Sequence, residues 1–116
     1  KAQNIIYTGY VPDEELRSLY KNCKAFLFPS LMEGFGIPPM EALYHGAPII
    51  ISNTSSLPEI YGNSAHYIDP YCYDYNLDEL LNESVENPDK ILKKFSWEKS
   101  AREWYALIEE CLKNKN

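Results

Sequence analysis

The sequence predicts an α/β fold, in which helices flank a parallel sheet and a helical region follows. Short apolar segments recur near residues 5–7, 25–28, 48–51 and 65–68 of the 116-residue chain, and stretches with helical features separate them. The segments at 25–28 and 48–51 are continuously apolar rather than alternating. That pattern is typical of strands covered on both faces, and hence of a parallel sheet.

Three helices are expected between these strands. The first follows Asp13, which we expect to cap it ahead of an acidic first turn. The second is expected to begin at Pro39 and to end before Gly46, because proline suits the first helical position and glycine the position past the end. Ser56 has the spacing of a capping box for a short third helix.

From about residue 76 to the end only helical patterns occur. Ser96 can cap the last helix, and the apolar residues of that helix recur near one face. These residues are Trp97, Ala101, Trp104, Ile108 and Cys111. We expect this stripe to pack on the core rather than to serve as a ligand platform.

Composition excludes several classes of function. The net charge of -6 is the opposite of what a nucleic-acid backbone or an anionic lipid surface attracts. The three cysteines are far apart and do not match a zinc site, so we expect small buried apolar residues, free thiols and a reducing cytoplasm. No apolar run approaches the ~18 residues of a membrane span, and no secretory leader is visible. The chain begins at Lys1 without methionine, from which we expect a piece of a longer protein.

The loop from Pro29 to Pro38 carries more chemistry than a turn requires. It follows the second expected strand, and ligands of an open parallel sheet bind outside the carboxyl ends of the strands. Gly34 and Gly36 let a ligand approach the N–H groups of residues 34–37, and the next helix adds positive potential. An anion site and a mere turn are both open at this point. The loop at residues 53–56 lies at the same edge, where helix capping and ligand contact are both open.

Two carboxylates make the anion site more specific. Glu33 caps no expected helix, so at a ligand edge it is expected to bind hydroxyls or to stabilise charge. Glu41 would be the third residue of a helix that starts at Pro39, where it could also cap that helix. The loop is no dinucleotide fingerprint, because Pro39 replaces the third glycine, and no P-loop, because Gly-Lys-Ser/Thr is missing. The residues themselves therefore predict a binder of a phosphate-bearing, hydroxyl-rich ligand.

The spacing Glu, seven residues, Glu around Gly34-Phe35-Gly36 is a specific motif, and further matches run through Pro58-Glu59 to Phe95-Ser96-Trp97-Glu98. With these motifs the chain resembles the C-terminal donor-binding domain of GT-B retaining glycosyltransferases, group 1 or family 4 type. The resemblance implies that residues 1–116 are a truncated, Rossmann-like nucleotide-sugar-binding domain.

The resemblance also assigns roles to residues. Glu33 would be the catalytic residue, in contact with the donor sugar hydroxyls near the reacting carbon. Glu41 would hold the ribose hydroxyls. The other implied donor-binding residues are Val11, Ser30, Gly34, Phe35, Gly36 and Ile37.

The implied activity is that of a hexosyltransferase that moves a sugar from a nucleotide-diphosphate sugar to a glycan or lipid-linked acceptor. It would use neither a metal nor another cofactor. The acceptor would bind through an upstream N-terminal domain, and upstream Arg and Lys would neutralise the diphosphate, so the 116 residues alone are expected to be inactive. The expected location is the cytoplasm, peripheral at the inner membrane face through that domain, in polysaccharide biosynthesis. A non-catalytic nucleotide-binding or interaction module and a GT-B sugar-nucleotide epimerase remain alternatives.

Overall fold

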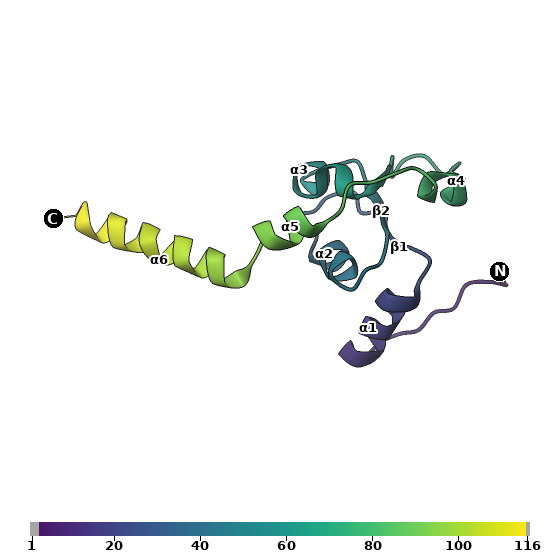
Figure 1. Cartoon of the computed structure of the whole chain (residues 1–116), viewed down its shortest axis with the longest axis horizontal. Coiled ribbons are helices and arrows are strands. Elements are labelled where there is room, and N and C mark those ends of the chain that lie inside the picture. Colours follow the sequence, from purple (N-terminus) through teal and green to yellow (C-terminus); the bar gives the residue numbers. More distant parts are fainter. Residues whose placement is uncertain (1–2, 116) are drawn as a thin grey trace.

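A three-stranded parallel sheet organises the chain, whose residues 3–115 are described by a computed structural model (Figure 1). The strands are β1 (Phe26–Phe28), β2 (Ile49–Ser52) and β3 (His66–Ile68), in the order β1-β2-β3. In the register, Leu27 lies opposite Ile50, and Ile51 opposite Tyr67. The predicted parallel α/β architecture is confirmed, and these strands lie within a residue of the ranges expected from the apolar segments.

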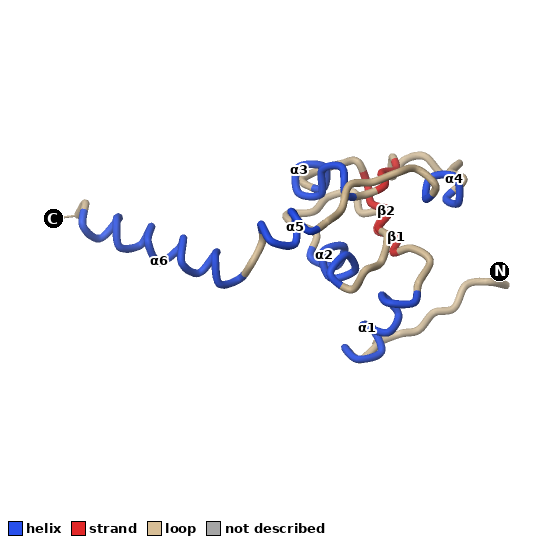
Figure 2. The backbone as a smooth tube through the Cα atoms, viewed as in Figure 1, coloured by secondary structure: helices blue, strands red, loops and turns tan. Residues whose placement is uncertain are grey.

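Helices connect and follow the strands (Figure 2). They are α1 (Asp13–Asn22), α2 (Ile37–Tyr44), α3 (Leu57–Tyr61), the 3-10 turn η1 (Gly62–Ser64), α4 (Leu77–Leu81), α5 (Asp89–Lys94) and α6 (Trp97–Lys113). Within residues 3–115, no helix is both long and apolar enough to cross a bilayer.

The core lies between β2 and the helices α1, α2 and α3. All four residues of β2 are buried, which explains why its sequence is continuously apolar up to Ser52. Ile49 and Ile51 pack with Leu57 and Tyr61 of α3, and with Ala42, Leu43, Ala47, Tyr20 and Ala65. Because α2 and α3 both rest on this central strand, the loops that precede them are fixed to the same edge of the sheet.

The first expected strand does not form. Residues 5–7 have no strand partner in the structure, and Ile5, Ile6 and Tyr7 are 78%, 87% and 95% exposed. A strand requires hydrogen bonds to a neighbouring strand, and within the described residues β1 pairs only with β2. An apolar segment alone therefore did not suffice to predict a strand here.

Three helix starts also differ from expectation. Pro12 rather than Asp13 occupies the cap position of α1, and Asp13 is the first helical residue. α2 begins at Ile37 rather than at Pro39, with Gly36 before it in a left-handed conformation. Ser56 precedes α3 but makes no capping hydrogen bond, because its hydroxyl is used elsewhere. Gly46, in contrast, follows α2 with a positive φ of 86°, as expected for a residue just past a helix end.

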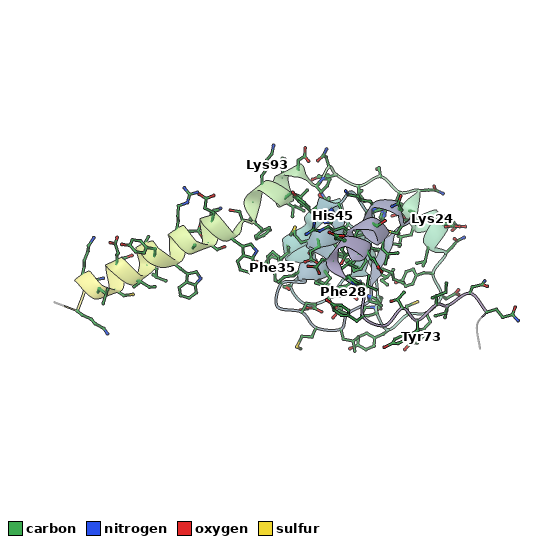
Figure 3. The ribbon with its side chains drawn as sticks, turned by 90° about the horizontal axis from the view of Figure 1, so that it is seen from below. Lys24, Phe28, Phe35, His45, Tyr73 and Lys93 are labelled. Atoms are coloured by element: carbon green, nitrogen blue, oxygen red, sulfur yellow. The ribbon has the colours of Figure 1, made fainter. Side chains whose placement is uncertain are left out.

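The C-terminal helix α6 projects away from the sheet (Figure 1), and its side chains extend into open space (Figure 3). Ser96 caps it as predicted, accepting a hydrogen bond from the Lys99 N–H at 3.1 Å. The expectation that its tryptophans pack on the core is wrong: Trp97 is 85% and Trp104 65% exposed. The expectation of buried cysteines also fails for Cys72 and Cys111, which are exposed, while Cys23 is partly buried. The apolar periodicity of a helix does not say whether a partner covers it.

Candidate active site

Side-chain hydroxyls join the loops that follow β1 and β2. The Ser55 hydroxyl accepts a hydrogen bond from the Glu33 N–H at 3.0 Å and donates one to the Glu33 carbonyl at 2.6 Å. Ser56 Oγ donates to the same carbonyl at 3.0 Å, and Thr54 Oγ1 donates to the Ser30 carbonyl at 3.3 Å. The two loops therefore meet at the carboxyl edge of the sheet, where parallel α/β folds bind ligands.

Glu33 lies in this junction, and hydrogen bonds hold both its backbone N–H and its carbonyl oxygen. Its side chain is partly buried, and Oε1 accepts a hydrogen bond from Ser30 Oγ at 2.8 Å. The serine hydroxyl restrains the carboxylate while the other acceptor positions of that group stay available. Ser30, predicted to bind donor, thus contacts the proposed catalytic residue directly.

The glycines of the loop have different physical roles. Gly36 has a φ of +79°, and an added Cβ would lie 2.7 Å from Leu57 Cδ2. The Gly36 carbonyl accepts a hydrogen bond from the Tyr61 hydroxyl at 2.5 Å. Burial raises the pKa of Tyr61, so this hydroxyl stays a protonated donor. Gly34 is exposed, and an added Cβ would meet no atom within 4 Å. Gly36 thus closes the loop onto α3, whereas Gly34 leaves space next to Glu33.

The start of α2 offers unpartnered amides. Among the hydrogen bonds of the described residues, the Glu33 N–H is taken by Ser55, while the N–H groups of residues 34–37 donate to no protein atom. Pro38 and Pro39 follow and have no N–H to add. Unpartnered amides at a helix N-terminus create, together with the helix dipole, a positive potential, so the turn can bind an anion.

Glu41 is the fifth residue of α2, not the third, so the alternative that it caps the helix is wrong. Its side chain is exposed. It lies close enough to α1 that its negative charge, after burial, is a cause of the raised pKa of the Tyr20 hydroxyl. A hydrogen bond between the Tyr20 hydroxyl and the Glu41 carboxylate contributes to the same pKa shift, so the carboxylate faces α1 rather than the helix start.

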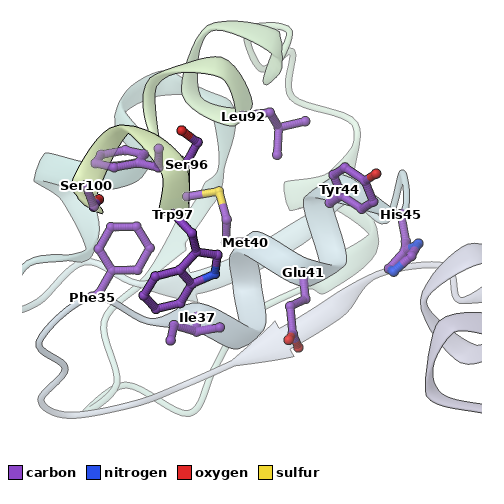
Figure 4. Close-up of a pocket in the computed structure, with 11 residues that line it drawn as sticks. Phe35, Ile37, Met40, Glu41, Tyr44, His45, Leu92, Ser96, Trp97 and Ser100 are labelled. Atoms are coloured by element: carbon purple, nitrogen blue, oxygen red, sulfur yellow. The ribbon is translucent and has the colours of Figure 1, made fainter. Parts of the chain in front are cut away.

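An apolar pocket of about 520 Å³ lies beside the loop and α2 (Figure 4). Phe35 contributes to its wall and packs edge-on against Phe95, with 5.0 Å between the ring centres. In Figure 4 the Glu41 carboxylate points away from the aromatic side chains. The pocket is lined by Phe35, Ile37, Met40, Glu41, Tyr44, His45, Leu92, Phe95, Ser96, Trp97 and Ser100. The loop thus has a polar side with Glu33 and the free amides, and an apolar side formed with α5 and α6.

Val11 lies just before α1 and is partly exposed, and no hydrogen bond of the described residues connects it to the loop at 29–36. Its role as a donor contact stays a prediction. His66 is 6% exposed in β3. Within residues 3–115, no three His, Cys, Asp or Glu side chains gather in a cluster that could hold a metal ion.

Sequence reasoning missed Ser55 and Tyr61. Ser55 belongs to a serine run that resembles a helix cap, and its contact with Glu33 spans 22 residues. Tyr61 reaches Gly36 over 25 residues from within a short helix. No local pattern carries such contacts. The one available signal was the expectation that both loops share a sheet edge.

The comparisons with known proteins agree on one family. The family model described as "Glycosyl transferases group 1" matches residues 1–104. The O-antigen chain mannosyltransferase B of Escherichia coli is 38% identical over 103 residues, covering 81% of this chain and 27% of that protein. The serotype-specific mannosyltransferase WbdA of Escherichia coli is 53% identical over 58 residues, or 50% of this chain and 7% of that protein.

A third relative is the MMP alpha-(1->4)-mannosyltransferase of Mycolicibacterium hassiacum. It is 29% identical over 124 residues, covering 94% of this chain and 30% of that protein. The chain thus spans less than a third of each of these three relatives. No solved structure matches the chain. The family match covers most of the residues, including both loops of the carboxyl edge, and the chain therefore belongs to the group 1 glycosyltransferases.

Proposed function

We propose that this chain is the donor-binding part of a retaining, GT-B-type glycosyltransferase that transfers a hexose from a nucleotide-diphosphate sugar to a glycan or lipid-linked acceptor. One observation carries the proposal. Glu33 is held at the carboxyl edge of a parallel sheet beside the unpartnered amides of residues 34–37, in a chain of the group 1 family.

In this proposal the donor lies across the loop after β1. The amides of residues 34–37 receive phosphate oxygens, since they have no protein acceptor and begin a helix. Glu41, exposed on α2, accepts hydrogen bonds from the two ribose hydroxyls. Charge-assisted hydrogen bonds of this kind are about twice as strong as neutral ones.

Glu33 then lies beside the hexose. Its carboxylate accepts hydrogen bonds from sugar hydroxyls. Its negative charge stabilises the positive charge that develops at the reacting carbon when the bond to phosphate breaks. Ser30 keeps one carboxylate oxygen in place through its 2.8 Å hydrogen bond. Backbone dipoles at the start of α2 stabilise the departing diphosphate, so we propose a reaction without metal or other cofactor.

The relatives described above are named mannosyltransferases, two of them for O-antigen or serotype-specific glycans. We therefore propose mannose as the transferred sugar and a surface polysaccharide as the product. The acceptor would bind through a further domain. Because this chain has a net charge of -6, the Arg and Lys side chains that neutralise the diphosphate would come from upstream strands of the donor-binding domain itself. We propose a cytoplasmic location for the reaction, where nucleotide sugars are used.

A donor panel with the natural full-length protein tests the proposal. GDP-mannose, UDP-glucose and ADP-glucose are each supplied together with glycan and lipid-linked acceptors, with and without EDTA, and nucleoside diphosphate release is followed. Release from at least one donor is expected, unchanged by EDTA and reduced at least tenfold in Glu33→Gln. Binding without turnover would instead indicate a non-catalytic module, and conversion of the sugar without release of nucleotide would indicate an epimerase. Either result would contradict the proposal.

A further inference from the structure

We propose that Ser55 is a positioning residue, which fixes the backbone of Glu33 and thereby the place of its carboxylate in the reaction. The inference rests on the proposed role of Glu33 in the donor site. Ser55 lies in the loop after β2. It is 22 residues from Glu33 in the sequence but contacts Glu33 directly in space.

A single hydroxyl holds both polar backbone atoms of Glu33. Ser55 Oγ accepts from the Glu33 N–H at 3.0 Å and donates its proton to the Glu33 carbonyl at 2.6 Å. Both distances are within the range of good hydrogen bonds. Because the hydroxyl proton is already committed to the Glu33 carbonyl, Ser55 has no donor left for a substrate. Its geometry therefore fits an indirect role, not a substrate contact.

The backbone of Ser55 supports the same conclusion. Its φ is +59°, a left-handed conformation that is unfavourable for any residue with a Cβ. The other residues of positive φ within 3–115 are all glycines, namely Gly9, Gly36, Gly46 and Gly62. A glycine at position 55 would adopt this conformation without strain. Serine differs from glycine there by its hydroxymethyl group alone, and that group is fully occupied with Glu33.

The remaining contacts of Glu33 do not replace Ser55. The Glu33 carbonyl has a second donor in Ser56 Oγ at 3.0 Å, and the carboxylate has Ser30. The Glu33 N–H, however, has Ser55 Oγ as its partner, and next in the chain comes Gly34, which is exposed and unconstrained by neighbours. Removing the Ser55 hydroxyl thus leaves the peptide between Met32 and Glu33 with one remaining hydrogen bond, from Ser30 Oγ to the Met32 carbonyl at 3.2 Å. Because the same Ser30 hydroxyl also donates to the Glu33 carboxylate at 2.8 Å, this peptide can then rotate more easily.

Such a rotation moves the carboxylate relative to the reacting carbon. A misplacement of about 1 Å can reduce a catalysed rate by about 100-fold, even where the altered residue does not touch substrate. Ser55 would then affect kcat more than donor KM, since the amides of residues 35–37 and Glu41 are not attached to it, and the peptide that carries the Gly34 N–H keeps Ser56 Oγ as a second donor to its carbonyl.

The test uses Ser55→Gly and Ser55→Ala in the natural full-length protein, with the donor of the panel that the wild type turns over. Both variants lack the hydroxyl, but only Ser55→Ala keeps a Cβ in the left-handed conformation. We expect kcat to fall about 10- to 100-fold in both, with KM changed less than about threefold. The melting temperature should be lower in Ser55→Ala than in Ser55→Gly. Equal kcat with unequal stability separates positioning from folding.

A double-variant cycle and hydrogen exchange complete the test. In a Glu33→Gln background, Ser55→Gly should lower kcat by less than about twofold, because the two residues act through one carboxylate. Amide exchange in the peptide that covers residues 31–35 should be faster in Ser55→Gly. Ser84→Gly is a control of the same type, in the exposed loop between α4 and α5. It should alter neither kcat nor the amide exchange of residues 31–35.

Two results would overturn the inference while the proposed function stands: Glu33→Gln lowers kcat but Ser55→Gly does not, or Ser55→Gly lowers kcat equally in both backgrounds. A kcat that follows the melting temperature across the two Ser55 variants would likewise reduce Ser55 to a structural residue. If Glu33→Gln leaves kcat unchanged, the proposed role of Glu33 fails, and the positioning of Glu33 for catalysis fails with it.

Discussion

Gly36→Ala should destabilise the fold through the loop that carries the proposed site. Gly36 has a φ of +79°, which an alanine adopts at a cost of ~1–2 kcal/mol. The new Cβ would lie 2.7 Å from Leu57 Cδ2, and Leu57 is fully buried, so its side chain has no open space to turn into. Overpacking of a buried site costs ~1–3 kcal/mol. Together these contributions give about 2–5 kcal/mol.

Gly34→Ala is a matched control two residues away. Gly34 has no left-handed φ, and an added Cβ would meet nothing within 4 Å. Its effect on the free energy of unfolding should be within about 0.5 kcal/mol, as for most surface substitutions. The pair thus compares the same chemical change in one loop, with and without steric and conformational strain.

Urea unfolding of both variants, followed by circular dichroism, gives the two free energies, and thermal melts give a second measure. For a domain of this size each kcal/mol lowers the melting temperature by about 4–8 °C. Gly36→Ala should therefore melt at least about 8 °C below wild type, with Gly34→Ala close to wild type. Equal midpoints for the two variants would refute the proposed contact of the loop with α3.

Further predictions concern the site and its environment. Glu33→Gln should lower kcat/KM by about 10- to 150-fold while the protein stays folded, because the loss of one charged hydrogen bond costs roughly 1.5–3 kcal/mol. Unchanged kinetics would make Glu33 an ordinary loop charge. Glu41→Gln should raise donor KM without weakening α2, because Glu41 is the fifth helical residue; a large loss of stability would contradict this. The 116-residue chain alone should bind GDP-mannose with a Kd of about 1 mM or weaker by calorimetry, since its net charge is -6; micromolar binding would mean that the chain supplies its own cations. Burial raises the pKa of Tyr67 to about 12, so the unfolded chain loses this proton at a lower pH than the folded chain. The free energy of unfolding should therefore fall from pH 10 to 12. Tyr67→Phe should reduce that fall, and an equal fall in the variant would exclude this tyrosine as its source.

Long-range contacts set the limit of what the sequence could predict. The strands β1, β2 and β3 could be predicted because short apolar runs mark them in the sequence. The expectation that the runs at 25–28 and 48–51 are covered on both faces is confirmed for β2 but wrong for β1, where Leu27 is 45% exposed. The shared edge of the two loops followed from the parallel arrangement alone. A local signal also predicted the end of α2, because Gly46 takes a positive φ just past the helix.

Other features depend on partners far away in the chain. Ser56 has the spacing of a cap, yet its hydroxyl contacts Glu33 over 23 residues, a competition that no local rule resolves. α2 starts at Ile37 rather than at Pro39 because Gly36, just before it, takes a left-handed conformation. The Gly36 carbonyl accepts a hydrogen bond from the Tyr61 hydroxyl, a contact that the local sequence does not show. Residues 5–7 and α6 have apolar patterns but no partner within the described part of the chain, and apolar periodicity cannot distinguish a covered face from an uncovered one.

A crystal structure of the natural full-length protein with bound GDP would show whether the loop after β1 binds the donor. We expect phosphate oxygens within hydrogen-bond distance of the amides of residues 34–37 and ribose hydroxyls on the Glu41 carboxylate. Glu33 should lie beside the terminal phosphate, with its N–H still on Ser55 Oγ. A nucleotide bound at the opposite edge of the sheet, or one that contacts neither the loop after β1 nor Glu41, would contradict the account.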